Sequence, residues 1–107
     1  MTRKEIQCIR ITQMENILND LIAANTNLSN ALDAYEALQT KVKKLSDYYD
    51  SNTWSRVFSD DEKGLLPPDL KRGVLSEDEV FDALSDYREL YARMLDIVSK
   101  GLRKGTI

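Results

Sequence analysis

The residues of this 107-residue chain whose types could support chemistry are mainly acids and tyrosines. Carboxylates cluster at residues 60–62, and further acids follow at Asp69 and at residues 77–79. Carboxylate oxygens suit divalent cations, but this cluster lacks the alternating Asp-x-Asp-x-Asp-Gly spacing of an EF-hand loop. We therefore expect a solvated acidic loop that holds no metal. A metal-binding or small-ligand-binding protein, or an enzyme, that uses Asp60, Asp61, Glu62 and nearby tyrosines is the alternative.

Two residue types are scarce. The chain has no histidine, which removes the commonest general base, the commonest zinc ligand and any Ser-His-Asp or Cys-His nucleophile system. The single cysteine, Cys8, cannot form an intrachain disulfide, which favours a reducing compartment. No apolar run approaches the roughly 18 residues of a membrane span, and Glu5 and Arg10 interrupt any signal-peptide core. We expect a cytoplasmic protein that is not an enzyme and uses no cofactor.

A basic cluster lies at Lys41, Lys43 and Lys44. Nucleic-acid binding through this cluster is a second alternative. The net charge of -3 and a pI of about 4.9 give no general attraction to phosphate backbones, so we expect no nucleic-acid partner.

Five residues are candidates for contact with a protein partner: Tyr48, Tyr49, Trp54, Lys71 and Arg72. The aromatic residues among them fall at a predicted helix end and in a predicted loop, where recognition residues concentrate. The two bases precede Gly73, for which we expect a positive φ before the next helix, but they have no comparable structural need. The tyrosines as a set are expected in a core or an interface: Tyr35, Tyr48, Tyr49, Tyr87 and Tyr91.

A long N-terminal helix must position the first of these residues. Apolar residues follow a heptad from Ile11 to Tyr49, a spacing typical of a coiled coil, although the apolar face is broader than a strict two-stranded seam. Capping-box pairs at Thr2 and Glu5, or at Thr12 and Glu15, are candidate helix starts, and we favour the first. The seam residues are Met14, Leu18, Leu21, Asn25, Leu28, Leu32, Tyr35, Gln39, Val42, Ser46 and Tyr49.

The weakest part of this helix is Asn25-Thr26-Asn27, because these residues compete for backbone hydrogen bonds. The heptad phase passes through Asn25 without a slip, which favours one helix over two. After Tyr49 we expect a turn, a short helical turn at residues 54–58, the acidic loop, and an irregular segment around the double proline at residues 67–68.

A second helix is predicted over residues 76–104, with Ser76 as its N-cap and Glu79 as the reciprocal partner. These elements predict an all-α fold and a single helical domain over residues 1–107. The long helix packs antiparallel on the C-terminal helix in a helical hairpin, or in a three-helix bundle if it is broken near Asn25–Asn27.

Two segments carry a resemblance to a known family. Residues 45–54, Leu-Ser-Asp-Tyr-Tyr-Asp-Ser-Asn-Thr-Trp, and residues 66–78, which contain Lys-Arg-Gly-Val-Leu-Ser-Glu-Asp, make the chain similar to small bacterial proteins of the domain of unknown function 4298 family. The resemblance extends from about Met14 into the last helix. It implies a helical fold and supplies no function.

We expect a non-enzymatic intracellular interaction module that forms a homodimer, and the reason is helix length. Residues 12–49 span roughly 57 Å and residues 77–103 roughly 40 Å, so pairing leaves part of the long helix uncovered. A contiguous apolar patch of that size rarely stays in water, and a two-fold partner would cover it. The patch contains Ile9, Met14, Ile17, Leu18 and Leu21. A broken long helix could bury the same residues within a monomer.

Overall fold

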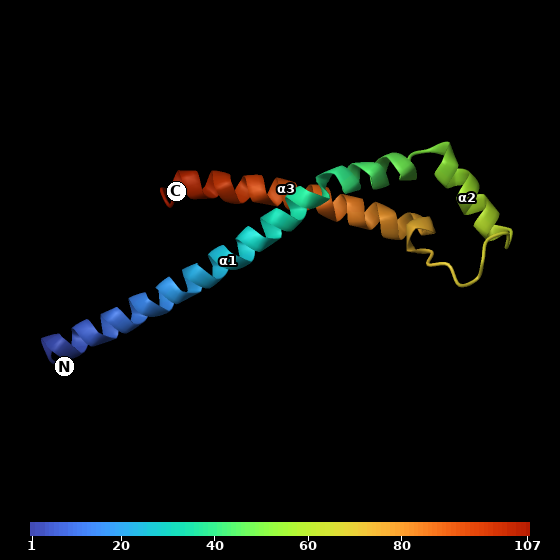
Figure 1. Cartoon of the computed structure of the whole chain (residues 1–107). Helices are drawn as coiled ribbons and strands as arrows, with labels where there is room; N and C mark the ends of the chain where they lie inside the picture. Colours follow the sequence, from blue (N-terminus) through green and yellow to red (C-terminus); the bar gives the residue numbers. More distant parts are fainter. The chain divides into compact units, whose positions relative to one another are not determined.

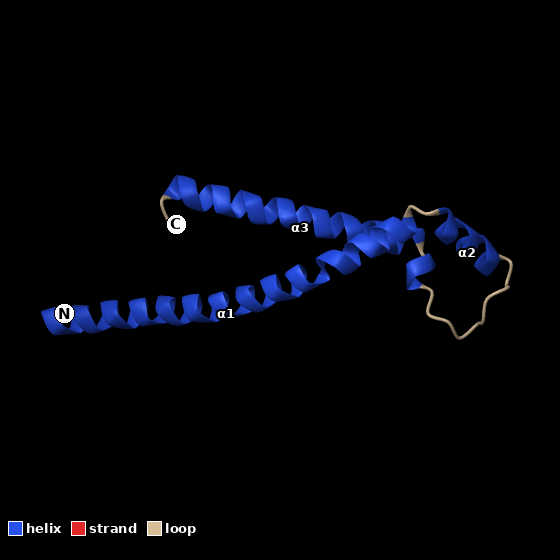
Figure 2. Ribbon diagram, turned by 45° about the horizontal axis from the view of Figure 1, so that its top comes forward, coloured by secondary structure: helices blue, strands red, loops and turns tan.

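The computed structural model describes residues 1–107 and contains helices without strands (Figures 1 and 2). In chain order the elements are α1 (Arg3–Tyr49), α2 (Asn52–Glu62), the 3-10 helix η1 (Gly73–Leu75) and α3 (Glu77–Lys104). The predicted all-α class is confirmed. Internal contacts divide the chain into an N-terminal unit, Met1–Thr40, and a C-terminal unit, Lys41–Ile107. The assignment of residues 1–107 to a single domain stays a prediction.

Helix α1 begins at the first of the two predicted capping boxes. The Glu5 N–H donates to Thr2 Oγ1 at 3.1 Å, and the Thr2 N–H donates to Glu5 Oε2 at 2.9 Å. Two of the backbone donors that a helix start leaves without partners are thus satisfied reciprocally.

The same helix continues through Asn25–Asn27, so the predicted unbroken helix is confirmed. The Thr26 hydroxyl, which could compete with the helix, instead donates to the Ile22 carbonyl at 3.2 Å. This bond to the preceding turn lets a threonine remain inside a helix.

The core of the C-terminal unit is small. It consists of four buried residues from α2, η1 and α3: Trp54, Leu75, Val80 and Leu84. The last turns of α1 lie beside the first turns of α3 and run in the opposite direction (Figures 1 and 2). Half-buried side chains of these turns include Val42, Leu45 and Tyr49, and the Tyr49 ring contacts Trp54 of this core. The predicted antiparallel packing is confirmed for this segment.

Helix α2 corrects the predicted acidic loop. Ser51 caps the helix by accepting the Trp54 N–H at 3.1 Å, and the helix continues through Glu62. Residues 60–62 therefore form its last turn. The helix ends at Gly64, whose φ is +73°, where the Leu65 N–H donates to the Asp60 carbonyl at 3.0 Å. A glycine in this left-handed conformation is a common helix stop, and it is the signal that the prediction of a loop overlooked.

Helix α3 occupies the predicted residues. Ser76 Oγ accepts the Glu79 N–H at 3.3 Å, which confirms Ser76 as the N-cap. The reciprocal bond is different from the predicted one, because the Ser76 N–H donates to the Gly73 carbonyl at 3.0 Å. The helix ends at Gly105, whose φ is +69°.

The expected positive φ of Gly73 is wrong, since positive φ occurs only at Gly64 and Gly105. Gly73 instead opens the 3-10 turn η1. A Cβ atom at this position would lie 3.2 Å from Glu79 Oε1. The expected cost of a larger residue there now comes from close approach to a side chain, which can move, and not from backbone strain.

The Ser76 cap gives a first testable prediction. Ser76→Ala should lower the free energy of unfolding by about 1 kcal/mol, because the first turn of α3 loses an acceptor for the Glu79 N–H. Urea denaturation followed by circular dichroism measures this. Ser99→Ala, within α3, is the matched control and should change the free energy by less than about 0.5 kcal/mol. An unchanged midpoint and m-value for Ser76→Ala would contradict the role of the cap.

Candidate interaction surface

Trp54 lies at the centre of an aromatic cluster with Tyr49 and Phe58. Its ring centroid lies 5.1 Å from that of Tyr49 in an edge-on arrangement and 5.2 Å from that of Phe58 in a stacked one. Its indole Nε1–H donates to the Val74 carbonyl at 2.8 Å. The cluster joins the end of α1, helix α2 and η1.

These contacts show that Trp54 is not a loop recognition residue, and α2 contains the short helical turn predicted for residues 54–58. The residue lies in the first turn of α2 and is only 9% exposed. Its large apolar surface is buried and its indole N–H has an acceptor within the C-terminal unit, so Trp54 has a packing role.

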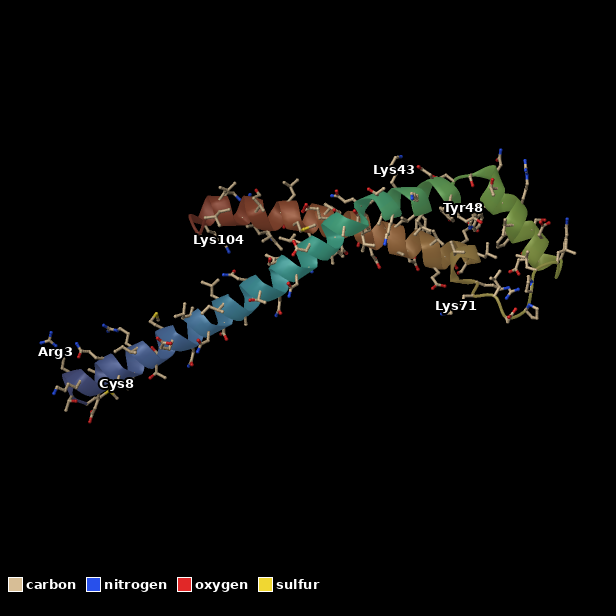
Figure 3. The ribbon with its side chains drawn as sticks, in the orientation of Figure 1. Arg3, Cys8, Lys43, Tyr48, Lys71 and Lys104 are labelled. Atoms are coloured by element: carbon tan, nitrogen blue, oxygen red, sulfur yellow. The ribbon has the colours of Figure 1, made fainter.

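Tyr48 and Tyr49, the other aromatic candidates, are half-buried at the end of α1 (Figure 3). Desolvation raises the pKa of Tyr49 above its usual value, and the nearby carboxylates of Glu77, Asp50 and Asp78 raise it further. On α3, Tyr87 and Tyr91 form a second aromatic pair, with their hydroxyl oxygens 3.1 Å apart.

Arg72 forms the main polar contact between α2 and the segment that follows it. Its Nε donates to Asp61 Oδ1 at 2.7 Å, and its Nη1 donates to the carbonyls of Leu70 at 2.7 Å and Pro68 at 3.2 Å. Its Nη2 donates to the Pro67 carbonyl. The guanidinium thus bonds three carbonyls of a segment whose prolines prevent a helix, and it neutralises an acid at the end of α2.

This network corrects the expectation that Lys71 and Arg72 are both exposed and structurally dispensable. The Arg72 side chain is 32% exposed and that of Asp61 is 21% exposed. Lys71, by contrast, is exposed on the segment between α2 and η1 (Figure 3). Lys71 remains a candidate for partner contact, whereas Arg72 holds the loop. The sequence carries one signal for this role, which is that three acids near the end of a helix need a compensating base.

The acids that suggested a metal site do not gather. The structure contains no group of three or more cysteine, aspartate or glutamate side chains arranged to hold a metal ion. Asp61 is paired with Arg72, and the acids at residues 77–79 occupy the first turn of α3, where the helix dipole favours them.

A second testable prediction concerns divalent cations. We expect EDTA or added Ca²⁺ to leave the melting temperature unchanged, because Asp61 already has a cationic partner. Differential scanning calorimetry in buffer with and without each reagent measures this. A shift of several degrees in either direction would contradict the prediction.

The basic cluster near the end of α1 is exposed. Lys43 forms an i,i+4 ion pair with Asp47 at 3.2 Å, with both side chains largely exposed. Such a pair contributes little to stability. Lys41 and Lys44 lie on the same stretch of helix as Lys43.

An exposed apolar stripe runs along α1, in which no residue is buried. We define the α1 stripe by its exposed residues: Ile11, Met14, Ile17, Leu18, Leu21, Ile22, Leu28 and Leu32, which are 44–62% exposed. The sequence did not predict a second exposed apolar surface near the end of α3, formed by Leu95, Val98 and Leu102, which are 50–72% exposed. No helix is long and apolar enough to cross a membrane.

The sequence matches the domain of unknown function DUF4298 over residues 11–97. The chain belongs to the DUF4298 family. No curated protein and no solved structure matches the chain.

The DUF4298 match includes the α1 stripe as well as the contacts of Arg72 and Trp54 in the C-terminal unit. It begins at Ile11, the first residue of the α1 stripe, and it contains Asp61, Arg72 and the aromatic cluster around Trp54. The match confirms the family that the resemblance suggested.

Proposed function

We propose that this DUF4298 protein is a non-enzymatic, intracellular helical interaction module that forms a homodimer through α1. The exposure of the α1 stripe carries this proposal. Met14, Leu18, Leu21 and Leu28 are 47–57% exposed although they occupy apolar positions of one heptad seam. A contiguous exposed apolar patch of this kind marks an interaction site in a water-soluble chain.

The proposed partner is a second copy of the chain. A stripe along one helix is self-complementary, because a two-fold axis brings the same residues of both copies together. Long helices owe most of their stability to the packing of an apolar face, so α1 would itself be stabilised by this contact. The single cysteine supports the intracellular location, since a chain of this size with one thiol uses no intrachain disulfide.

Light scattering coupled to size-exclusion chromatography tests the proposal. The monomer mass is 12.3 kDa, and we expect twice that value at micromolar concentration. Leu21→Asp should return the mass to that of the monomer, because a buried carboxylate in an apolar seam is costly. Asn16→Asp, on the side of α1 away from the seam, is the matched control and should remain dimeric.

Two results would overturn the proposal. A mass of 12.3 kDa for the unmodified chain would show that the α1 stripe does not mediate self-association. A dimer that survives Leu21→Asp would show that another surface, such as the one at the end of α3, holds the copies together.

A further inference from the structure

Resting on the proposed self-association, we propose that two copies pair their α1 helices in parallel and in register over residues 10–32. In this arrangement Asn25 of one copy faces Asn25 of the second. Two observations carry the proposal: the position of Asn25 within the apolar seam, and the charges that flank that seam.

The seam fits the heptad of a two-stranded coiled coil, in which positions a and d interdigitate with the partner helix. Position a is occupied by Ile11, Leu18, Asn25 and Leu32. Position d is occupied by Met14, Leu21 and Leu28. Asn25 is therefore the one polar residue in a stretch of seven seam positions, and it lies at position a.

Asn25 distinguishes the two possible orientations. In a parallel, in-register pair, position a faces position a, so the two Asn25 amides meet and hydrogen-bond to each other. In an antiparallel pair, position a faces position d, which in this stretch is a methionine or a leucine. The amide would then be buried without a partner, at a cost that a parallel pair avoids. A single asparagine at position a is a known determinant of register and of two-stranded assembly.

The flanking charges favour the same orientation. Arg10 lies at position g, and Glu15 lies at position e five residues later. Parallel helices bring position g of one strand next to the following position e of the other, so Arg10 faces Glu15 of the second copy, twice by symmetry. Five residues is not a spacing at which side chains meet within one helix. Neither residue has an opposite charge three or four positions away in its own helix.

The next pair of g and e positions brings two apolar side chains together in a parallel pair. Ile17 at position g faces Ile22 at position e of the second copy, and the two side chains are 59% and 56% exposed in the single chain. In an antiparallel pair, position g faces position g and position e faces position e. No acid occupies position g and no base occupies position e within residues 10–32, so neither Arg10 nor Glu15 would find an opposite charge.

The exposed Cys8, the only cysteine of the chain, provides a direct measurement of orientation. A nitroxide spin label on Cys8 reports the distance to the same label on the second copy by double electron–electron resonance. Parallel, in-register helices hold the labels across one interhelical spacing, so we expect a separation below about 25 Å. An antiparallel pair that sets each position a against a position d, such as Ile11 opposite Leu28, places Cys8 opposite Ala31, which adds roughly 35 Å along the axis. Figure 3 shows Cys8 near the start of α1.

A charge-swap series provides the second measurement. Arg10→Glu and Glu15→Arg should each weaken dimerisation about ten-fold, because each replaces two attractive pairs by two repulsive ones. The double variant Arg10→Glu/Glu15→Arg should restore the affinity of the unmodified chain. Lys44→Glu makes the same change in charge as Arg10→Glu outside the seam and is the control, for which we expect no change.

The outcomes separate this inference from the proposal on which it rests. A monomeric mass of the labelled chain and of the unmodified chain overturns the self-association itself. A dimeric mass with a label separation above about 30 Å overturns only the parallel orientation. A double charge-swap variant as weak as the two single variants combined also overturns it.

Discussion

Replacing Trp54 by alanine should lower the free energy of unfolding by about 3–5 kcal/mol, the cost of truncating a large aromatic residue in a packed core. The cost is expected to be high here because the core of the C-terminal unit has few members. Trp54 is one of four buried residues, and its ring contacts those of both Tyr49 and Phe58. Its loss also leaves the Val74 carbonyl without its donor.

Urea denaturation followed by far-ultraviolet circular dichroism measures this effect. The protein concentration must be the same for all variants, since self-association adds to apparent stability. Trp54→Phe keeps most of the packing and loses the hydrogen bond to Val74, so it should cost about 1–3 kcal/mol. Leu65→Ala, at a residue that is 68% exposed, should cost less than about 0.5 kcal/mol. A Trp54→Ala midpoint equal to that of Leu65→Ala would contradict the packing role.

Arg72→Ser should lower the free energy of unfolding by about 2 kcal/mol, whereas Lys71→Ser should change it by less than about 0.5 kcal/mol. The asymmetry follows from the contacts. Arg72 bonds Asp61 and the carbonyls of the preceding segment, and its removal leaves a carboxylate that is only 21% exposed without a cation. Lys71 is exposed.

The variant Arg72→Lys separates the contribution of the positive charge to stability from that of the hydrogen bonds that only a guanidinium can form. A lysine keeps the positive charge near Asp61 but cannot bond a carboxylate and several carbonyls at once, so it should recover only part of the lost stability. Asp61→Asn should be destabilising as well, and its effect should not add to that of Arg72→Ser because both variants remove the same ion pair. Equal effects of Arg72→Ser and Lys71→Ser would contradict the assignment.

Features that depend on neighbours in sequence could be predicted well. The capping pairs that begin α1 and α3 involve residues three positions apart, and the heptad that carries α1 through Asn25 is a local pattern. Each of these signals fixes backbone hydrogen bonds within one or two turns of a helix. The starts of α1 and α3 and the unbroken course of α1 were therefore within reach of the sequence.

Features that depend on contacts between residues distant in the sequence could not be predicted. The acidic turn at the end of α2 opposes the helix dipole by itself, and it becomes favourable only with Arg72, which lies 11 residues after Asp61. The indole of Trp54 likewise acquires its acceptor 20 residues away, at Val74. Composition placed Asp61 in a loop because the contact with Arg72 that orders it is not encoded by spacing.

The error at Gly73 has a different origin. A glycine before a helix cap suggested a left-handed residue, but the chain adopts that conformation at Gly64, immediately after the C-cap of α2. The left-handed conformation of Gly64 could be predicted only if residues 52–62 were recognised as a helix that this glycine ends.

The position of the one tryptophan gives the chain a built-in optical probe. Trp54 fluorescence reports the environment of α2 and η1, while circular dichroism in the far ultraviolet is dominated by the 47 residues of α1 and the 28 of α3. The two signals therefore weight the N-terminal and C-terminal units differently. Coincident denaturation curves indicate one cooperative transition, whereas an earlier loss of ellipticity than of fluorescence indicates that α1 unwinds while the tryptophan environment persists.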